Sequence, residues 1–330
     1  MIYPSFPKSG ETIGICAPSG GVGHKIESFD LSLSQIKKCE FKIKETPSVR
    51  NNASPSAQAM IRGSEFNSIW SDENISAIMS ATGGDFNFEM LPYIDIESIK
   101  SNPKWFAGYS DPTNIQMLIT TKLDIATIYG FNAGGFDSQN IHEFQNNALE
   151  IFKGNLVSQH SYEYYDSSKD FSDEVNMDTP VKWELFSPDN NTSLDVTGRL
   201  IGGCTEIIDL ILGTPYEDFH GFIDRYQDDG FIWFFDTYNA DAVSFYLKIL
   251  KMKTVGLFKN AKVLIFGRVM FTGGSTDEEY IELLQRAFPD VPFIWGADIG
   301  HTKPSMTLIN GAIGHLKMKN DKAILDMELR

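Results

Sequence analysis

The chain has 330 residues, 42% hydrophobic and 22% charged, and this composition is typical of a folded protein and excludes wholesale disorder. Its formal net charge of -16 argues against a basic surface for DNA, RNA or an anionic membrane, so we expect none of these partners. Because single hydrophobic cores usually stop growing at about 250–300 residues, the length predicts two domains around one cleft.

The first residues, MIYPSFPKSGETIGIC, lack the basic and long apolar segments of a signal peptide, and no later run approaches about 18 apolar residues. We therefore expect a cytoplasmic protein. The three cysteines, Cys16, Cys39 and Cys204, are widely spaced and form no CxxC pair. This spacing favours reduced thiols over a disulfide framework or a structural zinc site.

Strand-like and helix-like segments alternate in the first half of the chain. The pattern predicts strands over residues 12–18, 41–47, 75–84 and 104–110, and the apolar runs at 12–18 and 75–84 are expected to be buried. Apolar residues at helical spacing predict helices over residues 26–39 and 57–70, with another helix starting near Asp72. This order predicts a mostly parallel sheet whose site lies at the carboxyl ends of the strands.

A polar, irregular stretch from about residue 160 to 197 separates the two halves, and we interpret it as a linker and an active-site flap. The pattern beyond it is again α/β. We expect strands at 198–203, 231–236, 261–267 and 292–300, and helices at 240–251 and 277–288.

We therefore predict a two-domain α/β protein with its active site in the cleft between the domains. Residues 1–160 form an N-terminal domain with a Rossmann-like parallel sheet, and this domain carries the nucleophile. Residues 161–196 form the linker and flap. Residues 197–330 form a β-rich C-terminal α/β domain that carries the acid and the histidine.

Ser110 lies where the segment KWFAGYSDPTNIQMLIT changes from strand to helix. Asp111 fits an N-cap and Pro112 fits the first helical position. A hydroxyl in this turn would lie beside free backbone N–H groups at the positive end of a helix, which suits a nucleophile that must stabilise an oxyanion. The turn lacks the closing glycine of a G-x-S-x-G nucleophile elbow, so a simple helix-start turn is an equal alternative.

A serine nucleophile needs a base, and His301 has the most suggestive position among the six histidines. It follows the strand-like FIWGADI and a glycine, at the end of a strand where the site is expected. The alternative is an ordinary loop or core histidine.

The third member of a triad is a carboxylate that fixes the histidine tautomer. Asp236 closes the apolar run FIWFFD and is the preferred candidate. Its competitors are Glu206, Asp224 and Asp298.

Gly83 and Gly84 follow the apolar run ISAIMSAT and would let the backbone approach a ligand closely, as an oxyanion loop must. A plain strand-to-helix turn is the alternative. The sequence has neither a dinucleotide-binding GxGxxG after the first strand nor the GK[ST] of a P-loop, so we expect no nucleotide cofactor. It has no HExxH or similar spacing, so we expect no metal.

Several segments together resemble the LD-carboxypeptidase family of serine peptidases, which includes the microcin C immunity proteins. The matching segments are TIGICAPSG (12–20), RGSEFNSIWSDENISAIMSATGGDFNFEMLPYID (62–95), KWFAGYSDPT (104–113), LIGGC (200–204), FIWFFD (231–236) and GHTKPSMTLINGA (300–312). They span nearly the whole chain in the order of the family.

The resemblance implies that Ser110 is the nucleophile, that His301 is the base, and that the backbone at Gly84 and Asp111 forms the oxyanion hole. It also implies a homodimer. The family usually has a glutamate where this chain has Asp236, and aspartate is one methylene shorter. Either the backbone or His301 must therefore come closer to Asp236.

The resemblance implies two possible substrates. Immunity-type members cleave the amide that joins a peptide to a modified nucleotide, and murein-recycling members remove the terminal D-alanine of a murein tetrapeptide. The LIGGC segment, Trp183 and the polar insert before it slightly favour the immunity type. Gly83, Tyr109 and Trp183 are the expected substrate-binding residues.

Tyr162, Tyr164, Tyr165 and Trp183 either stack on a base or pack the flap. The rivals to these activities are a non-catalytic protein that binds a peptide or nucleotide conjugate, and a metal-dependent amidase.

Overall fold

The structure is a computed structural model that describes residues 1–169 and 175–330. Residues 170–174, part of the expected flap, lie outside the described residues. The chain divides into two compact units, Met1–Asn155 and Leu156–Arg330, and each is described by itself. Within the described ranges, no helix combines the length and the apolar character that crossing a membrane requires.

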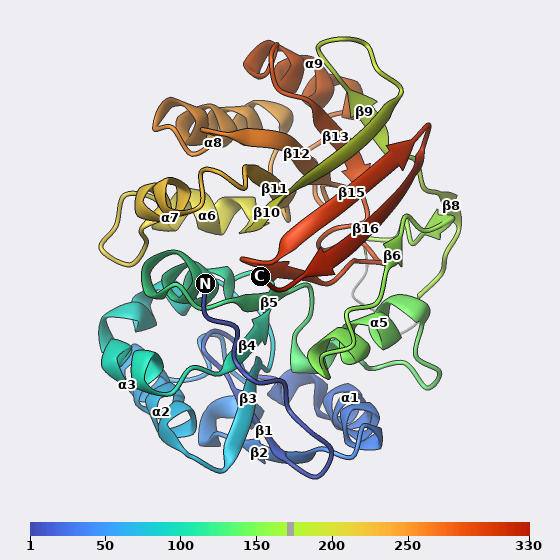
Figure 1. The fold of residues 1–330 in the computed structure, drawn as a ribbon. Helices are drawn as coiled ribbons and strands as arrows, with labels where there is room; N and C mark the ends of the chain where they lie inside the picture. Colours follow the sequence, from blue (N-terminus) through green and yellow to red (C-terminus); the bar gives the residue numbers. More distant parts are fainter. Residues whose placement is uncertain (170–174) are drawn as a thin grey trace. The chain divides into compact units, whose positions relative to one another are not determined.

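The first unit is built on a parallel sheet, as the alternating pattern predicts (Figure 1). Its strands pair in the order β5-β4-β3-β1-β2, and the chain moves from β1 first to one side and then to the other. The switch point between β1 and β3 is where ligands bind in such sheets. The strands are β1 (Thr12–Cys16), β2 (Lys42–Glu45), β3 (Ile75–Ser80), β4 (Trp105–Gly108) and β5 (Thr127–Tyr129).

Helices flank this sheet on both faces, with α1 on one side and α2 and α3 on the other (Figure 1). In α1, Phe29, Leu33 and Ile36 recur at helical spacing and are buried. The helices of this unit are α1 (Ile26–Lys38), α2 (Ala59–Ser71), α3 (Ile96–Ser101), α4 (Thr113–Met117), which continues as a π-helical turn (Leu118–Lys122), and α5 (Glu143–Phe152).

The helix expected to start near Asp72 is wrong. The Asp72 carboxylate accepts a hydrogen bond from the Asn74 backbone N–H at 2.9 Å, and this local contact makes a turn. The chain then enters β3 at Ile75, so Asp72 marks the end of α2 rather than a new helix.

The second unit contains an eight-stranded mixed sheet in the order β6-β16-β15-β10-β11-β12-β13-β9. Strands β10 to β13 run parallel, and the other pairs are antiparallel. The strands are β6 (Gln159–His160), β9 (Glu184–Phe186), β10 (Ser193–Cys204), β11 (Phe231–Asp236), β12 (Ala261–Gly267), β13 (Phe293–Ala297), β15 (Ile313–Lys319) and β16 (Lys322–Glu328). Three short strands complete the unit: β7 (Tyr164–Tyr165), β8 (Thr179–Pro180) and β14 (Leu308–Asn310).

The helices of the second unit are α6 (Thr205–Ile211), α7 (Phe219–Arg225), α8 (Ala242–Thr254) and α9 (Asp277–Ala287). Helix α8 lies beside both α6 and α9 (Figure 1). Every residue of β11 is buried, as expected of a parallel strand covered on both faces. The fold is therefore the predicted two-domain α/β architecture, and its parallel strands bring Cys204, Asp236 and Gly267 to one edge of the second sheet.

Candidate active site

The turn after β4 holds Ser110 in a left-handed backbone conformation, with φ of 67°. A residue with a Cβ adopts this conformation at a cost of about 1–2 kcal/mol, so the turn is held by its surroundings. The Ser110 carbonyl accepts hydrogen bonds from the Thr113 backbone N–H at 2.9 Å and from the Thr113 hydroxyl at 2.6 Å. The strand therefore ends in a sharp turn that leads directly into α4.

Asp111 does not cap this helix, because Pro112 takes the N-cap position instead. The Asp111 side chain is buried and accepts hydrogen bonds from the Ser19 hydroxyl, the Asn87 backbone N–H at 2.8 Å and the Asn114 side-chain amide at 3.0 Å. Burial raises the pKa of Asp111 to about 6. The N-cap prediction was wrong because the carboxylate is drawn into contacts with distant loops.

The paired glycines after β3 lie directly against the serine turn. A Cβ placed on Gly83 would come within 3.3 Å of the Ser110 hydroxyl oxygen. A Cβ on Gly84 would lie 2.4 Å from the Ser19 hydroxyl, and Gly84 has a φ of 145°. The approach at Gly84 requires glycine, whereas a Cβ at Gly83 would be a tight contact. Gly84 and Asp111 thus flank Ser110 within the first unit, while the oxyanion role of their N–H groups stays a prediction.

Tyr109 precedes the nucleophile candidate and is held by its backbone. Its N–H donates to the Asn132 side-chain oxygen at 3.2 Å, and its ring meets Tyr129 edge to face at 6.4 Å. These contacts orient the chain as it enters the turn. Substrate binding by Tyr109 stays a prediction.

A cavity of about 400 Å³ lies beside the same glycine loop. No acidic side chain lines it, so this part of an acidic protein places no negatively charged side chain against a ligand. The lining residues are Gly20, Gly21, His24, Asn52, Ala53, Ser54, Thr82, Gly83 and Gly84.

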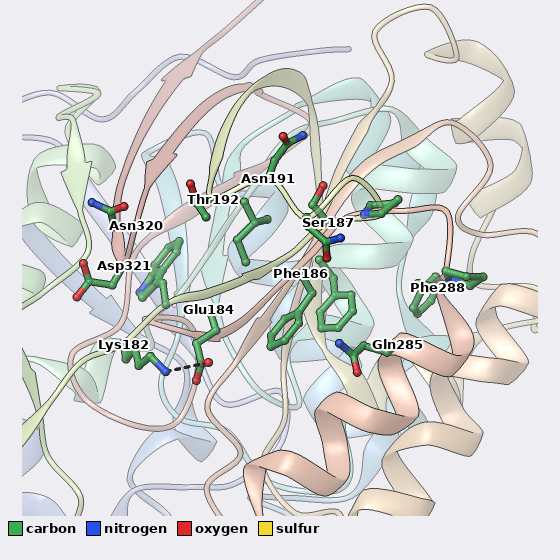
Figure 2. Close-up of a pocket in the computed structure, with 16 residues that line it drawn as sticks. Lys182, Glu184, Phe186, Ser187, Asn191, Thr192, Gln285, Phe288, Asn320 and Asp321 are labelled. Carbon is green, nitrogen blue, oxygen red and sulfur yellow. Dashed lines mark ion pairs between the residues drawn. The ribbon is translucent and has the colours of Figure 1, made fainter.

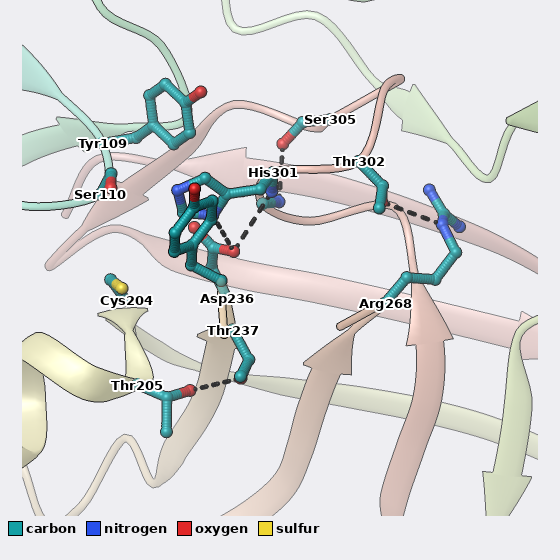
Figure 3. Close-up of polar contacts among 12 residues, drawn as sticks. Tyr109, Ser110, Cys204, Thr205, Asp236, Thr237, Arg268, His301, Thr302 and Ser305 are labelled. Carbon is teal, nitrogen blue, oxygen red and sulfur yellow. Dashed lines mark hydrogen bonds and ion pairs between the residues drawn. The ribbon is translucent and has the colours of Figure 1, made fainter. Parts of the chain in front are cut away.

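The second unit joins the other two candidates at the end of its sheet (Figure 3). Asp236 is the last residue of β11 and is fully buried. Its Oδ1 lies 2.8 Å from Nδ1 of His301, and the backbone N–H of His301 donates to the same oxygen at 3.2 Å. A carboxylate at Nδ1 favours the tautomer that protonates Nδ1, which leaves Nε2 as a proton acceptor.

Gly300 explains how a short aspartate reaches the histidine. Its φ is 107°, and a Cβ there would lie 2.0 Å from Oδ1 of Asp236. The Gly300 N–H donates to the Ser305 hydroxyl at 2.9 Å, which fixes the loop (Figure 3). The backbone before His301 is therefore drawn against the carboxylate.

The competing carboxylates have other partners. Glu206 accepts hydrogen bonds from the backbone N–H groups of Tyr238 at 3.1 Å and Asn239 at 2.8 Å, so it fixes the loop after β11. Asp224 pairs with Lys259 at the surface. Asp298 is buried and pairs with Arg268 at 2.8 Å.

Two residues that the sequence did not single out, Tyr238 and Arg268, lie around the His301–Asp236 pair and its loop. The Tyr238 ring lies 4.8 Å from the His301 imidazole and is partly exposed. Arg268 donates to the Thr302 hydroxyl at 3.1 Å and the Gly296 carbonyl at 3.0 Å, which braces the loop around His301. No local sequence pattern distinguishes these residues, because their partners are distant along the chain.

Trp183 is buried, and its indole N–H donates to Asp298 at 2.9 Å. The Tyr162 backbone N–H donates to the same carboxylate oxygen at 3.0 Å, and the Tyr165 ring covers the Arg268 guanidinium at 4.4 Å. The expected flap residues thus pack on the pair that braces the His301 loop. Base stacking by Trp183 stays a prediction.

A cavity of about 660 Å³ in the second unit lies elsewhere (Figure 2). It borders β9 and the start of β13 at Phe293, and the ion pair between Lys182 and Glu184 lies at its wall. His301 follows the opposite end of β13, so the cavity is separate from the His301–Asp236 pair. Among the residues that the structure describes, no three His, Cys, Asp or Glu side chains group as a metal ion would require.

Comparison with known proteins places both units in one family. The LD-carboxypeptidase N-terminal domain matches residues 13–130, and the LD-carboxypeptidase C-terminal domain matches residues 197–316. The microcin C7 self-immunity protein MccF of Escherichia coli is 25% identical over 258 residues, covering 75% of this chain and 72% of its own. A Bacillus subtilis protein named as a probable murein peptide carboxypeptidase is 23% identical over 216 residues, covering 65% of this chain and 60% of its own.

Solved structures agree on the fold. The MccF-like protein of Bacillus anthracis superposes with a TM-score of 0.82 at 21% identity, and each chain is fully covered. MccF in complex with glutamyl sulfamoyl guanosine gives a TM-score of 0.79 at 21% identity, with 99% of this chain and 98% of that chain covered. With both of its units matched and this fold, the chain belongs to the LD-carboxypeptidase family of serine peptidases.

Proposed function

We propose that this chain is a serine-type amide hydrolase in which Ser110 is the nucleophile, His301 the general base and Asp236 the acid. The observation that carries the proposal is the 2.8 Å contact between Asp236 and Nδ1 of His301 at the end of a buried strand. A triad needs this arrangement, because the imidazole must present a basic Nε2 to the serine. The left-handed turn at Ser110 supports the nucleophile assignment.

The proposed reaction has two stages. Nε2 of His301 accepts the Ser110 proton while the serine oxygen attacks the amide carbonyl, and the oxyanion accepts hydrogen bonds from the N–H groups of Gly84 and Asp111. His301 then returns the proton to the leaving amine. Water hydrolyses the resulting acyl-enzyme by the same route, which frees the acid and restores Ser110.

The substrate that we favour is a microcin-type peptidyl nucleotide. Support comes from the similarity to MccF, whose structure holds glutamyl sulfamoyl guanosine, and from the partly exposed Tyr238 ring beside His301, which offers an aromatic surface. The second candidate is a murein tetrapeptide that loses its terminal D-alanine. The likeness to the Bacillus subtilis protein supports it.

The remaining proposals concern assembly and location. We propose a cytoplasmic homodimer in which residues 161–196 act as linker and flap, and the Tyr165 ring over Arg268 supports contact between the start of that segment and the brace of the His301 loop. Sedimentation would report twice the chain mass of 37.0 kDa for the dimer and the single mass for a monomer.

Mass-spectrometric product analysis tests the activity. Wild type, Ser110→Ala and His301→Ala are incubated with a murein tetrapeptide and with a peptidyl-adenylate analogue. We expect wild type to cleave the nucleotide conjugate, and we expect each variant to lose at least about 10³-fold in rate, since base and nucleophile act together. His315→Ala is the matched control, because His315 on β15 contacts Thr197 of β10 and Glu328 of β16, far from the end of β11 that carries Asp236, and should keep the wild-type rate.

The outcomes separate the candidates. Release of D-alanine alone would replace the immunity-type substrate by the murein substrate. Saturable binding without product in the wild type would favour a non-catalytic binder. Near-normal turnover by either variant, with His315→Ala unchanged, would refute the triad.

A further inference from the structure

We propose that the side chain of Asp111 is a positioning residue that holds the glycine loop against Ser110, in addition to any role of its backbone. This inference rests on the proposed function of Ser110. It concerns a side chain that never needs to contact the substrate, and it is argued from the contacts of three loops in the first unit.

Asp111 gathers the loops that follow three strands of the first sheet. It lies in the turn after β4, Ser19 lies in the loop after β1, and Asn87 begins the 3-10 helix (Asn87–Tyr93) that ends the loop after β3. One carboxylate oxygen of Asp111 accepts from both the Ser19 hydroxyl and the Asn87 N–H. These loops flank the switch point of the sheet, so a single buried carboxylate ties together the segments that surround it.

Ser19 transmits this restraint to the glycine loop. Its hydroxyl donates to Asp111 and accepts a hydrogen bond from the Phe86 N–H at 3.3 Å. Gly84 packs directly on the same hydroxyl, and Gly83 accepts a hydrogen bond from the Gly20 N–H at 3.1 Å. The position of the loop relative to Ser110 therefore depends on where Asp111 holds Ser19.

A second buried group braces the far side of the same loops. The Arg62 guanidinium from α2 is buried and donates to the Pro18 carbonyl at 2.6 Å and to the Phe86 carbonyl at 2.8 Å. Arg62 thus joins the loops after β1 and β3 to each other. Asp111 is the group that joins them to the nucleophile turn, because its own backbone follows Ser110.

The chemistry of a buried carboxylate favours a positioning role for Asp111 over a role in stability alone. Burying a carboxylate costs free energy that hydrogen bonds must offset, and an apolar side chain would avoid that cost. Three donors converge on the Asp111 carboxylate. Such a set is expected where the positions of backbone groups must be held within fractions of an ångström, as in an oxyanion hole.

A fluorophosphonate probe tests this inference without knowledge of the substrate. The Ser110 oxygen forms a bond to phosphorus, fluoride leaves, the serine proton passes to the base, and the phosphoryl oxygen of the adduct occupies the oxyanion hole. The maximal labelling rate and the probe affinity are measured separately. Peptide mass spectrometry confirms that Ser110 carries the adduct.

We expect Asp111→Ala to lower the maximal labelling rate at least about 100-fold, the size of effect seen when an oxyanion donor is lost, with probe affinity within about 3-fold. Ser19→Ala should lower the maximal labelling rate about 10-fold. Asp111→Asn keeps one acceptor oxygen, so its maximal labelling rate should lie within about 10-fold of the wild-type rate. Circular dichroism and thermal unfolding establish that each variant is folded.

Glu65 and Ser48 supply the matched controls. The Glu65 carboxylate also accepts from a serine hydroxyl, at 2.5 Å, and from the Ser48 N–H, at 3.3 Å, but this pair lies on α2 and the turn after β2. Glu65→Ala and Ser48→Ala should label at rates within about 2-fold of wild type. A wild-type rate in Asp111→Ala would overturn the inference.

Hydrogen exchange separates this inference from the proposed function. If the glycine loop is held by Asp111, amides in residues 82–87 should exchange at least about 10-fold faster in Asp111→Asn and Ser19→Ala, and those near Glu65 should not. Failure of wild type to label at Ser110 would refute the proposed nucleophile, whereas unchanged exchange would refute the positioning role.

Discussion

Asp236 and Gly300 show how a site adapts to a shorter acid. The glycine backbone occupies the space next to the carboxylate that a longer side chain would need, and the His301 N–H donates to the same oxygen. The short Asp236 side chain and the close approach of the Gly300 backbone therefore fit one another. This pairing supports a working acid at this position, despite the family's usual glutamate.

Asp236→Glu should consequently lower the turnover of the protein. The extra methylene pushes the carboxylate into the Gly300 backbone, so we expect turnover to fall about 10- to 100-fold, and Asp236→Asn to lose about 10⁴-fold because the imidazole tautomer is no longer fixed. Steady-state kinetics on the cleaved substrate would measure both effects. Asp224→Glu at the surface is the control, and a glutamate variant as active as wild type would contradict this account.

The candidate residues differ in how well the sequence marks them. Ser110, Asp236 and His301 end or follow apolar runs, so strand periodicity identified them as candidates. Arg268 and Tyr238 carry no such mark, because their importance comes from partners brought together only by folding. The N-cap interpretation of Asp111 failed for the same reason, since two of its three donors lie 92 and 24 residues away.

At the scale of elements, the loop after β13 is held by a buried ion pair. Arg268, from the segment after β12, pairs with Asp298, which also accepts from Trp183 and Tyr162. The short strands β7 and β8 flank these contacts through Tyr165. The expected flap is therefore connected to the His301 loop through one carboxylate.

Arg268→Ala should destabilise the fold strongly. It leaves Asp298 buried without its cation, which typically costs about 3–5 kcal/mol, whereas Lys259→Ala at the exposed Asp224 pair should cost at most about 1 kcal/mol. Urea denaturation followed by tryptophan fluorescence would compare the two. A cost below about 1 kcal/mol for Arg268→Ala would mean that this pair does not hold the loop.

Strands β3, β4 and β11 were predictable because burial on both faces makes them continuous apolar runs. The hairpin of β15 and β16 was missed although its residues alternate between buried and exposed, with Asn320 left-handed at the turn. Helix α7 was missed because it is only seven residues long and contains a glycine. Short elements depend on tertiary packing more than on their own periodicity.

At the scale of the whole molecule, Asp111 links stability to pH. Its pKa is raised from 3.8 to about 6 by burial, so the folded chain keeps a proton that the unfolded chain loses. The free energy of unfolding should therefore fall as pH rises from about 4 to about 6, by about 3 kcal/mol at most, and this cost then persists at neutral pH.

Asp111→Asn should remove this slope. Relative to wild type, we expect the variant to gain up to about 3 kcal/mol in unfolding free energy between pH 4 and pH 7, while its labelling rate falls. Chemical denaturation across this range would measure the difference. Asp241→Asn is the contrast: hydrogen bonds from Ser244 lower the pKa of Asp241, so its contribution is lost only as pH falls below the ordinary aspartate range.

The left-handed Ser110 also bears on how an inactive form for ligand trapping is chosen. Alanine keeps the Cβ that makes a φ of 67° costly, whereas glycine adopts this conformation freely. Ser110→Gly therefore removes the proposed nucleophile and relieves the strained turn in one step. Ser110→Gly is therefore a better variant than Ser110→Ala for crystallising the protein with an uncleaved ligand.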